Sequence, residues 1–146
     1  MFLTDEELAL IERAKEYLYA FLSEFGEFLP FTMLMQGDEI FPLEHEVNEK
    51  SSTPAYLINM YEEYFCKERK DNAGYQVGLL CIDISIRSKT QTNRRSGIEY
   101  RLFGTDCTKS VIQYYQIKKD KTVLFEEMVG WGGEEKAIHS MIMNGE

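Results

Sequence analysis

Hydrophobic residues near the start of the chain recur every three or four positions, the spacing of one face of an α-helix. Thr4 and Glu7 precede this stripe with the spacing of a capping box, and Gly26 follows it as a stop signal. The pattern predicts a helix over 4–25. Its apolar stripe consists of Leu8, Ile11, Ala14, Leu18, Phe21, Leu22 and Phe25.

A second segment with helical spacing begins after Thr53, which suits an N-cap, and Pro54, which suits the first helical position. Gly74 marks its expected end. The basic residues near that end interact favourably with the negative pole of the helix dipole. The apolar stripe of this helix is Leu57, Ile58, Tyr61, Tyr64 and Phe65.

The other apolar segments are short and are typical of strands. Residues 75–87 form the clearest one, because its later part alternates between apolar and polar side chains while its earlier part is apolar on both faces. Pro42 lacks a backbone donor, so the strand that contains it is expected to lie at a sheet edge or to end there. The expected strands are 28–35, 40–43, 75–87, 97–103, 110–117 and 122–128.

The element order α-β-β-α-β-β-β(β) predicts an α+β fold in two layers, with both helices over one face of an antiparallel sheet of about five to six strands. The order is similar to that of profilin-like and roadblock-like domains. We expect a single domain over 1–146, with residues 130–146 as a flexible or docking C-terminal tail.

The chain is acidic, with 25 Asp and Glu against 16 Lys and Arg and a net charge of −9. This charge argues against nucleic-acid binding, which requires a basic surface. It favours a basic protein partner, although solubility alone also accounts for it. No apolar run is long enough to span a membrane, and the N-terminus lacks the regions of a signal peptide. We therefore expect a cytoplasmic protein without membrane contact.

The cysteines argue against a metal centre. Cys66, Cys81 and Cys107 are odd in number, form no CxxC motif and have only two histidines to complete a site. We expect free, mostly buried thiols, and neither a metal nor a cofactor.

Two candidate catalytic residues stand out. His45 lies among carboxylates in the segment 38–46, and Asp83 is the one acid in a strongly apolar strand. Brought together, they would form a general acid–base pair. Alternatively, His45 lies in a solvated loop, and Asp83 faces water or a partner.

Candidate binding residues lie in a basic loop and among the later aromatic residues. The loop 87–95 includes Arg87, Arg94 and Arg95, whose guanidinium groups suit a phosphate or an acidic peptide. The alternative is a solvated hairpin loop.

Trp131 stands among glycines and is either a partner anchor or a lid on the core. Tyr114 and Tyr115 must point to opposite faces of their strand. With Tyr100 and Phe103 they form either an exposed aromatic patch or ordinary cross-strand packing.

No Gly-x-Ser-x-Gly, HExxH or GxGxxG motif is present. The stretch 24–31 (EFGEFLPF) resembles a recurring element of small uncharacterised bacterial proteins, in which a helix ending leads into a hairpin, a helix and a β-meander. The resemblance covers about the first 45 residues and carries over no functional residue. Some small acidic bacterial proteins of similar size are immunity proteins that block a toxin.

The leading prediction is a non-enzymatic binding protein that engages a basic partner, with toxin immunity as its most specific form. The alternative is a small-molecule-binding or hydrolytic domain built around His45, Asp83 and the loop 87–95. A third prediction is a homodimer that pairs through edge strands or the tail.

Overall fold

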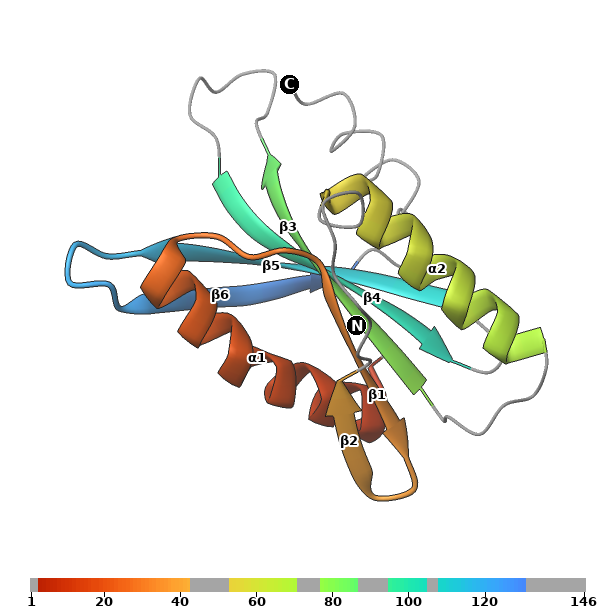
Figure 1. The fold of residues 1–146 in the computed structure, drawn as a ribbon. Helices are drawn as coiled ribbons and strands as arrows, with labels where there is room; N and C mark the ends of the chain where they lie inside the picture. Colours follow the sequence, from red (N-terminus) through yellow and green to blue (C-terminus); the bar gives the residue numbers. More distant parts are fainter. Residues whose placement is uncertain (1–2, 43–52, 71–76, 87–94, 105–107, 131–146) are drawn as a thin grey trace.

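Figure 1 shows the protein as a computed structural model, in which residues 3–42, 53–70, 77–86, 95–104 and 108–130 are described. Two helices and six strands follow one another in the predicted order, so the α+β fold class and the element order are confirmed. The elements are α1 (Asp5–Phe25), β1 (Phe31–Gln36), β2 (Glu39–Pro42), α2 (Pro54–Lys70), β3 (Val77–Ile86), β4 (Arg95–Gly104), β5 (Thr108–Ile117) and β6 (Val123–Gly130).

The six strands form one antiparallel sheet in the order β2-β1-β3-β4-β5-β6. Strands that follow one another along the chain are therefore neighbours in the sheet, except β2 and β3, which are separated by α2 along the chain and by β1 in the sheet. The short strand β2, which ends at Pro42, is an edge strand as its proline predicts.

The ends of α1 are fixed by the residues that the sequence indicated. The Glu7 amide donates to Thr4 Oγ1 at 3.1 Å, and the Thr4 amide donates to Glu7 Oε1 at 2.8 Å, which completes the capping box. At the other end Gly26 adopts φ +77°, and its amide donates to the Leu22 carbonyl at 3.0 Å. Glycine reaches this left-handed conformation at little cost, so the helix ends there.

The buried face of α1 differs in part from the predicted stripe. Leu10, which the stripe omitted, is fully buried, whereas Leu8 and Phe25 are 36% and 65% exposed. The expectation that Leu8 and Phe25 face the core is therefore wrong, because the sheet contacts a narrower stripe rotated toward Leu10. The buried stripe is Leu10, Ile11, Ala14, Leu18 and Leu22.

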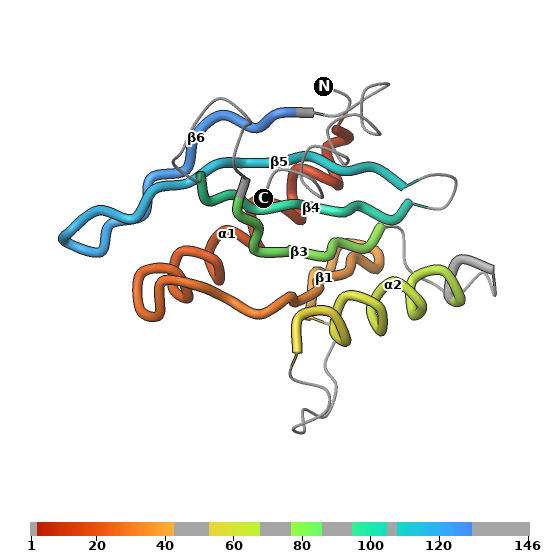
Figure 2. The backbone as a smooth tube through the Cα atoms, turned by 90° about the horizontal axis from the view of Figure 1, so that it is seen from above, coloured from red at the N-terminus to blue at the C-terminus, as the bar shows by residue number. Residues whose placement is uncertain are grey.

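The two helices pack on opposite faces of the sheet, so the expected two-layer arrangement is wrong. Leu79 of β3 packs in the cluster that contains the α1 stripe, whereas its neighbour Leu80 packs with Leu57 and Phe65 of α2. Figure 2 shows the sheet with α1 crossing it and α2 along its β1–β3 side. The physical reason is that the central strands are apolar on both faces, and each apolar face has to be covered.

The described cysteines match the expected thiol state in part. Cys81 is a free, buried thiol, and burial raises its pKa. Cys66 is free but exposed, so the expectation of burial is wrong for it. Cys107 lies outside the described residues. No helix in the described part of the chain is long and apolar enough to cross a membrane.

Candidate binding groove

A groove lies along β3 where this strand extends beyond β1. The β1–β3 pairing ends at Phe31 opposite Cys81, but β3 continues to Ile86. Figure 2 shows the connector 26–30 and the start of α2 on the side of β3 that faces away from β4. The end of α1, this connector and the start of α2 therefore enclose the last part of β3.

The groove is large enough to hold part of a partner. Its volume is about 900 Å³, near the upper end of the range of roughly 300–1,000 Å³ for ligand sites. Most of the lining side chains are apolar. They are Phe21, Phe25, Phe28, Leu29, Pro30, Phe31, Pro54, Ile58, Ile82 and Ile84, together with Gly26, Glu27, Asp83, Ser85 and Ser96.

The wall of the groove formed by the end of α1, the connector 26–30 and the start of β1 is aromatic and partly open to water. The Phe31 ring meets those of Phe21 and Phe28 edge to face, with centroids 5.7 and 5.8 Å apart. Phe25 and Leu29 stand beside them at 65% and 50% exposure. Edge-to-face contacts stabilise the three packed rings. Phe25 and Leu29 keep exposed apolar surface that a partner could bury.

Asp83 is the main polar group of the groove. Its Oδ1 accepts a hydrogen bond from the Tyr115 hydroxyl at 2.9 Å, and its Oδ2 accepts one from the Phe28 amide at 3.4 Å. Burial raises the pKa of Asp83, and the nearby Glu27 charge adds to this, although both hydrogen bonds oppose it. Burial and the Asp83 charge likewise raise the pKa of Tyr115. Asp83 therefore fixes the connector to the sheet and places a carboxyl group in the groove.

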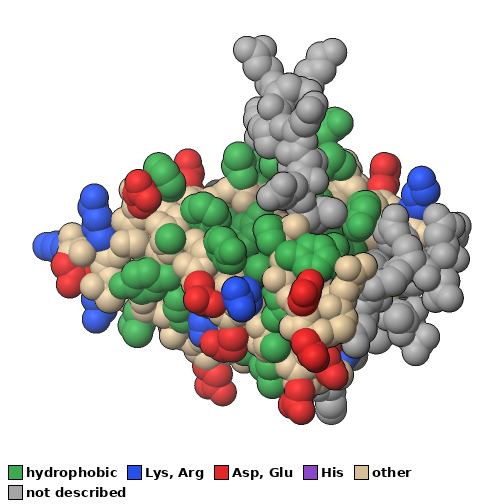
Figure 3. All heavy atoms as spheres, turned by 60° about the horizontal axis from the view of Figure 1, so that its bottom comes forward, with side chains coloured by type: hydrophobic (Ala, Val, Ile, Leu, Met, Phe, Trp, Pro, Cys, Tyr) green, Lys and Arg blue, Asp and Glu red, His purple; other side chains and the backbone are tan. Residues whose placement is uncertain are grey.

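Charges near the groove are mainly negative. The lining residues that the structure describes include Glu27 and Asp83 but no lysine or arginine. On the face shown in Figure 3, acidic side chains stand among hydrophobic ones, and a group of basic side chains lies at the far left tip. That tip is the β5–β6 turn, where Lys118, Lys119 and Lys121 are exposed.

The predicted catalytic pair is not tested, because His45 lies outside the described residues. Asp83 neither faces open water nor stands unpaired, since it is half-buried and both its oxygens accept hydrogen bonds. The described lining residues include no histidine, cysteine or lysine, so they form no Ser–His, Cys–His or Ser–Lys pair.

Of the predicted binding residues, Arg95 and Tyr115 are described, whereas Arg87, Arg94 and Trp131 lie outside the described part. Arg95 pairs with Glu126 at 2.6 Å and lies over the Tyr114 ring at 3.8 Å, so its guanidinium is already engaged. Tyr115 is buried and serves the groove by holding Asp83.

The aromatic residues of β4 and β5 form ordinary packing. Tyr100 and Phe103 are buried, and Tyr114 is half-buried under Arg95. The Tyr100 hydroxyl donates to Gln113 Oε1 at 2.7 Å within the core. Of the two alternatives, cross-strand packing is therefore the one observed among these residues.

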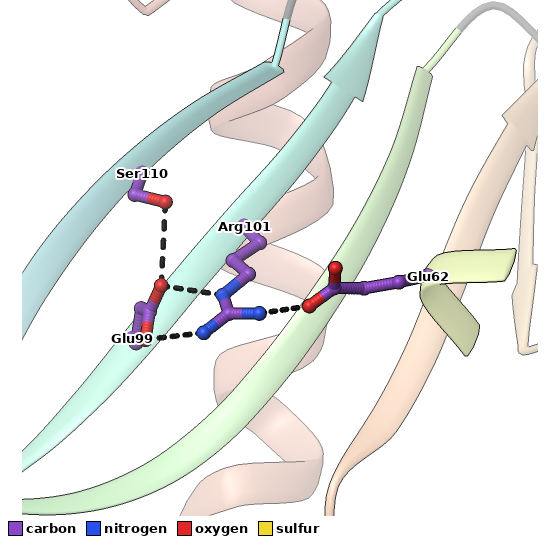
Figure 4. Close-up of polar contacts among 4 residues, drawn as sticks. All are labelled: Glu62, Glu99, Arg101 and Ser110. Atoms are coloured by element: carbon purple, nitrogen blue, oxygen red, sulfur yellow. Dashed lines mark hydrogen bonds and ion pairs between the residues drawn. The ribbon is translucent and has the colours of Figure 1, made fainter. Parts of the chain in front are cut away.

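A second polar cluster lies on the α2 face of the sheet (Figure 4). Arg101 Nε donates to Glu99 Oε2 at 2.6 Å, and Arg101 Nη1 donates to Glu62 of α2. Ser110 Oγ donates to the same Glu99 oxygen at 3.3 Å. The side chains of Arg101 and Glu99 are only 20% and 4% exposed. The cluster is therefore a tie between α2 and the sheet, with its donors and acceptors satisfied internally.

The sequence analysis missed both the groove and this cluster. Glu99 and Arg101 are two residues apart in a strand and so share a face, which was a usable signal. The groove had no comparable signal, because its residues come from four separate stretches of the chain.

Within the described residues, no group of three or more His, Cys, Asp or Glu side chains is arranged to hold a metal ion. Comparisons with protein-family models, with curated proteins and with solved structures found no match for this chain.

Proposed function

We propose that the protein is a binding module that takes an apolar segment of a basic protein partner into the groove beside β3. The observation that carries the proposal is the joint exposure of Phe25 and Leu29 at the rim of the groove of about 900 Å³. Large apolar side chains clustered at a concave surface are typical of interaction sites.

Charge supports a basic partner. The chain carries a net charge of −9, and the described residues of the groove lining include two carboxylates and no basic side chain. Such a surface attracts a cationic protein over a distance and raises the rate of association more than the final affinity. In its most specific form, the proposal is that the protein is an immunity protein and that its basic partner is the toxin it blocks.

The binding function is tested with a random twelve-residue peptide library displayed on phage. The library is selected on the wild-type chain and depleted on a variant with Phe25→Glu and Leu29→Glu. We expect the surviving peptides to combine apolar residues with lysine or arginine. Fluorescence anisotropy should show affinity for the double variant at least roughly tenfold lower, since two buried apolar contacts are lost.

The matched control is Leu124→Glu. The control also carries Val129→Glu. Leu124 and Val129 are 45% and 44% exposed on β6 and do not line the groove, so the two changes together add the same two negative charges elsewhere. Peptides that bind the wild type, the double variant and the control equally would refute the assignment of the groove.

The electrostatic part has its own measurement. Association of a selected peptide, followed by stopped-flow fluorescence, should slow steeply as salt is added, because ions screen attraction between separated charges. A rate that does not change with salt would contradict steering by the acidic surface.

A second candidate is a small-molecule site in the same groove, with Asp83 as its polar anchor. The raised pKa of Asp83 favours it, since perturbed carboxyl groups in clefts mark functional sites. Fragment screening by NMR would support this candidate if bound fragments shift the signals of groove residues and Asp83→Asn abolishes the effect. A screen without groove binders would exclude it.

A further inference from the structure

We propose that the occupant of the groove is an extended segment of the partner that adds as a strand to the free edge of β3 at residues 82–86, with a lysine or arginine directed to Asp83 and Glu27. This strand addition, called the strand mode below, rests on the proposed binding function and specifies the conformation and chemistry of the bound segment.

The free edge follows from the register of the sheet. β4 pairs with β3 along its full length, from Val77 opposite Gly104 to Ile86 opposite Arg95. β1 pairs with β3 only as far as Cys81. Among the described strands, residues 82–86 therefore have a partner on one side only, and every second residue directs its main-chain N–H and C=O to the other side.

The connector beside this edge does not complete the sheet. Among the described residues, no backbone hydrogen bond joins 26–30 to 82–86. The contact is made instead by the Asp83 side chain, which accepts from the Phe28 amide. The main-chain groups of the edge thus stay unused by the connector.

The groove is open at the edge of β3 rather than over one of its faces. Successive residues of a strand point to opposite faces, yet both Ile82 and Asp83 line the groove, as do Ile84 and Ser85. A cavity above one face would be lined by every second residue only. The strand edge is therefore the floor of the groove.

The groove has one wall on each face of the sheet, and the side chains of an added strand would point alternately to these two faces. Phe25 and Phe28 line the groove from the α1 side, and Pro54 and Ile58 line it from α2. The two helices cover opposite faces of the sheet. An added strand would place alternate side chains against these two walls, which is how strand-addition sites combine main-chain affinity with side-chain specificity.

The edge at 82–86 also lacks the lysines and prolines that keep many strand edges from pairing. Proteins protect such edges with short strands, prolines, lysines or irregular register. β2 has four residues and ends in Pro42, and the pairing of β6 shifts register near Gln113. The sequence Ile-Asp-Ile-Ser-Ile at 82–86 has no lysine or proline.

The electrostatics of the groove favour a cation on the occupant. Glu27 and Asp83 line it, and the last turn of α1 contains no basic residue. Gly26, which caps α1, also lines the groove. The negative end of the helix dipole therefore adds to the two carboxylates.

The experiment uses a peptide obtained in the selection described above and the full chain. Each backbone amide of the peptide is N-methylated in turn, and affinity is measured by fluorescence anisotropy. We expect losses of roughly tenfold at every second position, because a lost main-chain hydrogen bond and the added methyl group act together. Asp83→Asn should reduce the preference for a peptide with lysine over its norleucine analogue, whereas Glu127→Gln, an exposed change on β6, should not.

The outcomes separate the strand mode from the binding function. A two-residue period of losses supports strand addition. Losses spaced every three or four residues, with a helical circular-dichroism signal, would overturn strand addition and leave the binding function standing. If no selected peptide distinguishes the wild type from the Phe25→Glu and Leu29→Glu variant, both proposals fail.

A second copy of the chain is the competing occupant of this edge. We expect a monomer in sedimentation-velocity experiments. A dimer that dissociates on Ser85→Lys, a change at an exposed groove residue, would assign the edge to self-association and overturn the proposed partner.

Discussion

Gly78 is the position where one added methyl group should disturb the structure most clearly. It lies in β3 directly under Phe65 of α2, which is fully buried and stacks on Phe103 with ring centroids 4.8 Å apart. A Cβ atom at Gly78 would lie 2.7 Å from both Cδ1 and Cζ of Phe65 and still closer to its Cε1. Gly78→Ala therefore forces the Phe65 ring to move.

The size of the effect follows from that overlap. Carbon atoms pack at about 3.5–4.0 Å, so the ring must shift by about 1 Å or more against neighbours that enclose it. Overpacking of this kind costs typically about 1–3 kcal/mol. We expect the free energy of unfolding in urea to fall by at least this amount.

Gly97→Ala is the matched control, since Gly97 lies in the adjacent strand β4 on the same face of the sheet. Its added Cβ would meet Tyr114 Cδ1 at 3.4 Å, an ordinary contact. We expect a change within about 0.5 kcal/mol. Phe65→Leu should partly rescue Gly78→Ala, with a coupling energy of roughly 0.5–3 kcal/mol in a double-mutant cycle. Equal effects of the two glycine substitutions would refute the packing of Phe65 against β3.

Three further predictions concern polar contacts. Arg101→Met should lower the free energy of unfolding in urea by about 3–5 kcal/mol, because it leaves the buried Glu99 carboxylate without its cation; a loss below about 1 kcal/mol would contradict a buried ion pair. Burial raises the pKa of Asp83 in the folded protein, so the fold binds this proton more tightly than the unfolded chain does. The stability of the wild type relative to Asp83→Asn should therefore fall as the pH rises above the usual aspartate pKa of 3.8. Thermal unfolding is measured between pH 3 and pH 7. A relative stability that rises with pH would contradict a pKa of Asp83 raised by burial. Thr4→Ala should cost about 1 kcal/mol in urea unfolding by removing the acceptor of the Glu7 amide; an unchanged midpoint would show that the capping box contributes nothing.

The family resemblance of the stretch 24–31 stays a prediction, but the structure gives this stretch a place. It ends α1, passes beside β3 and enters β1, and all its residues after Glu24 line the groove. The pattern of the sequence marked the stretch as a helix ending followed by a strand. It gave no reason to expect exposed Phe25 and Leu29 at a shared cavity.

The candidate catalytic and binding residues show where sequence reasoning stopped. Asp83 was singled out as an acid in an apolar strand, and it does lie in the groove. Arg95 was singled out as a candidate for binding a phosphate or an acidic peptide, yet it pairs with Glu126 of β6. A sequence pattern identifies unusual residues, but it does not identify the residues that meet them across the sheet.

The sequence by itself determined the elements, their order and both ends of α1, but not the start of β1, which was expected at Phe28 and lies at Phe31. These features depend on groups a few residues apart, such as Thr4 with Glu7 or Gly26 with Leu22, so local spacing is enough to predict them. Only the tertiary structure decided which face each helix covers, where the groove lies and how Arg101 is paired. Those features depend on contacts such as Phe28 with Asp83 and Arg101 with Glu62, which are 55 and 39 residues apart. Contacts of that kind are set by the packing of the whole chain, because burying both apolar faces of the sheet fixes which distant side chains meet.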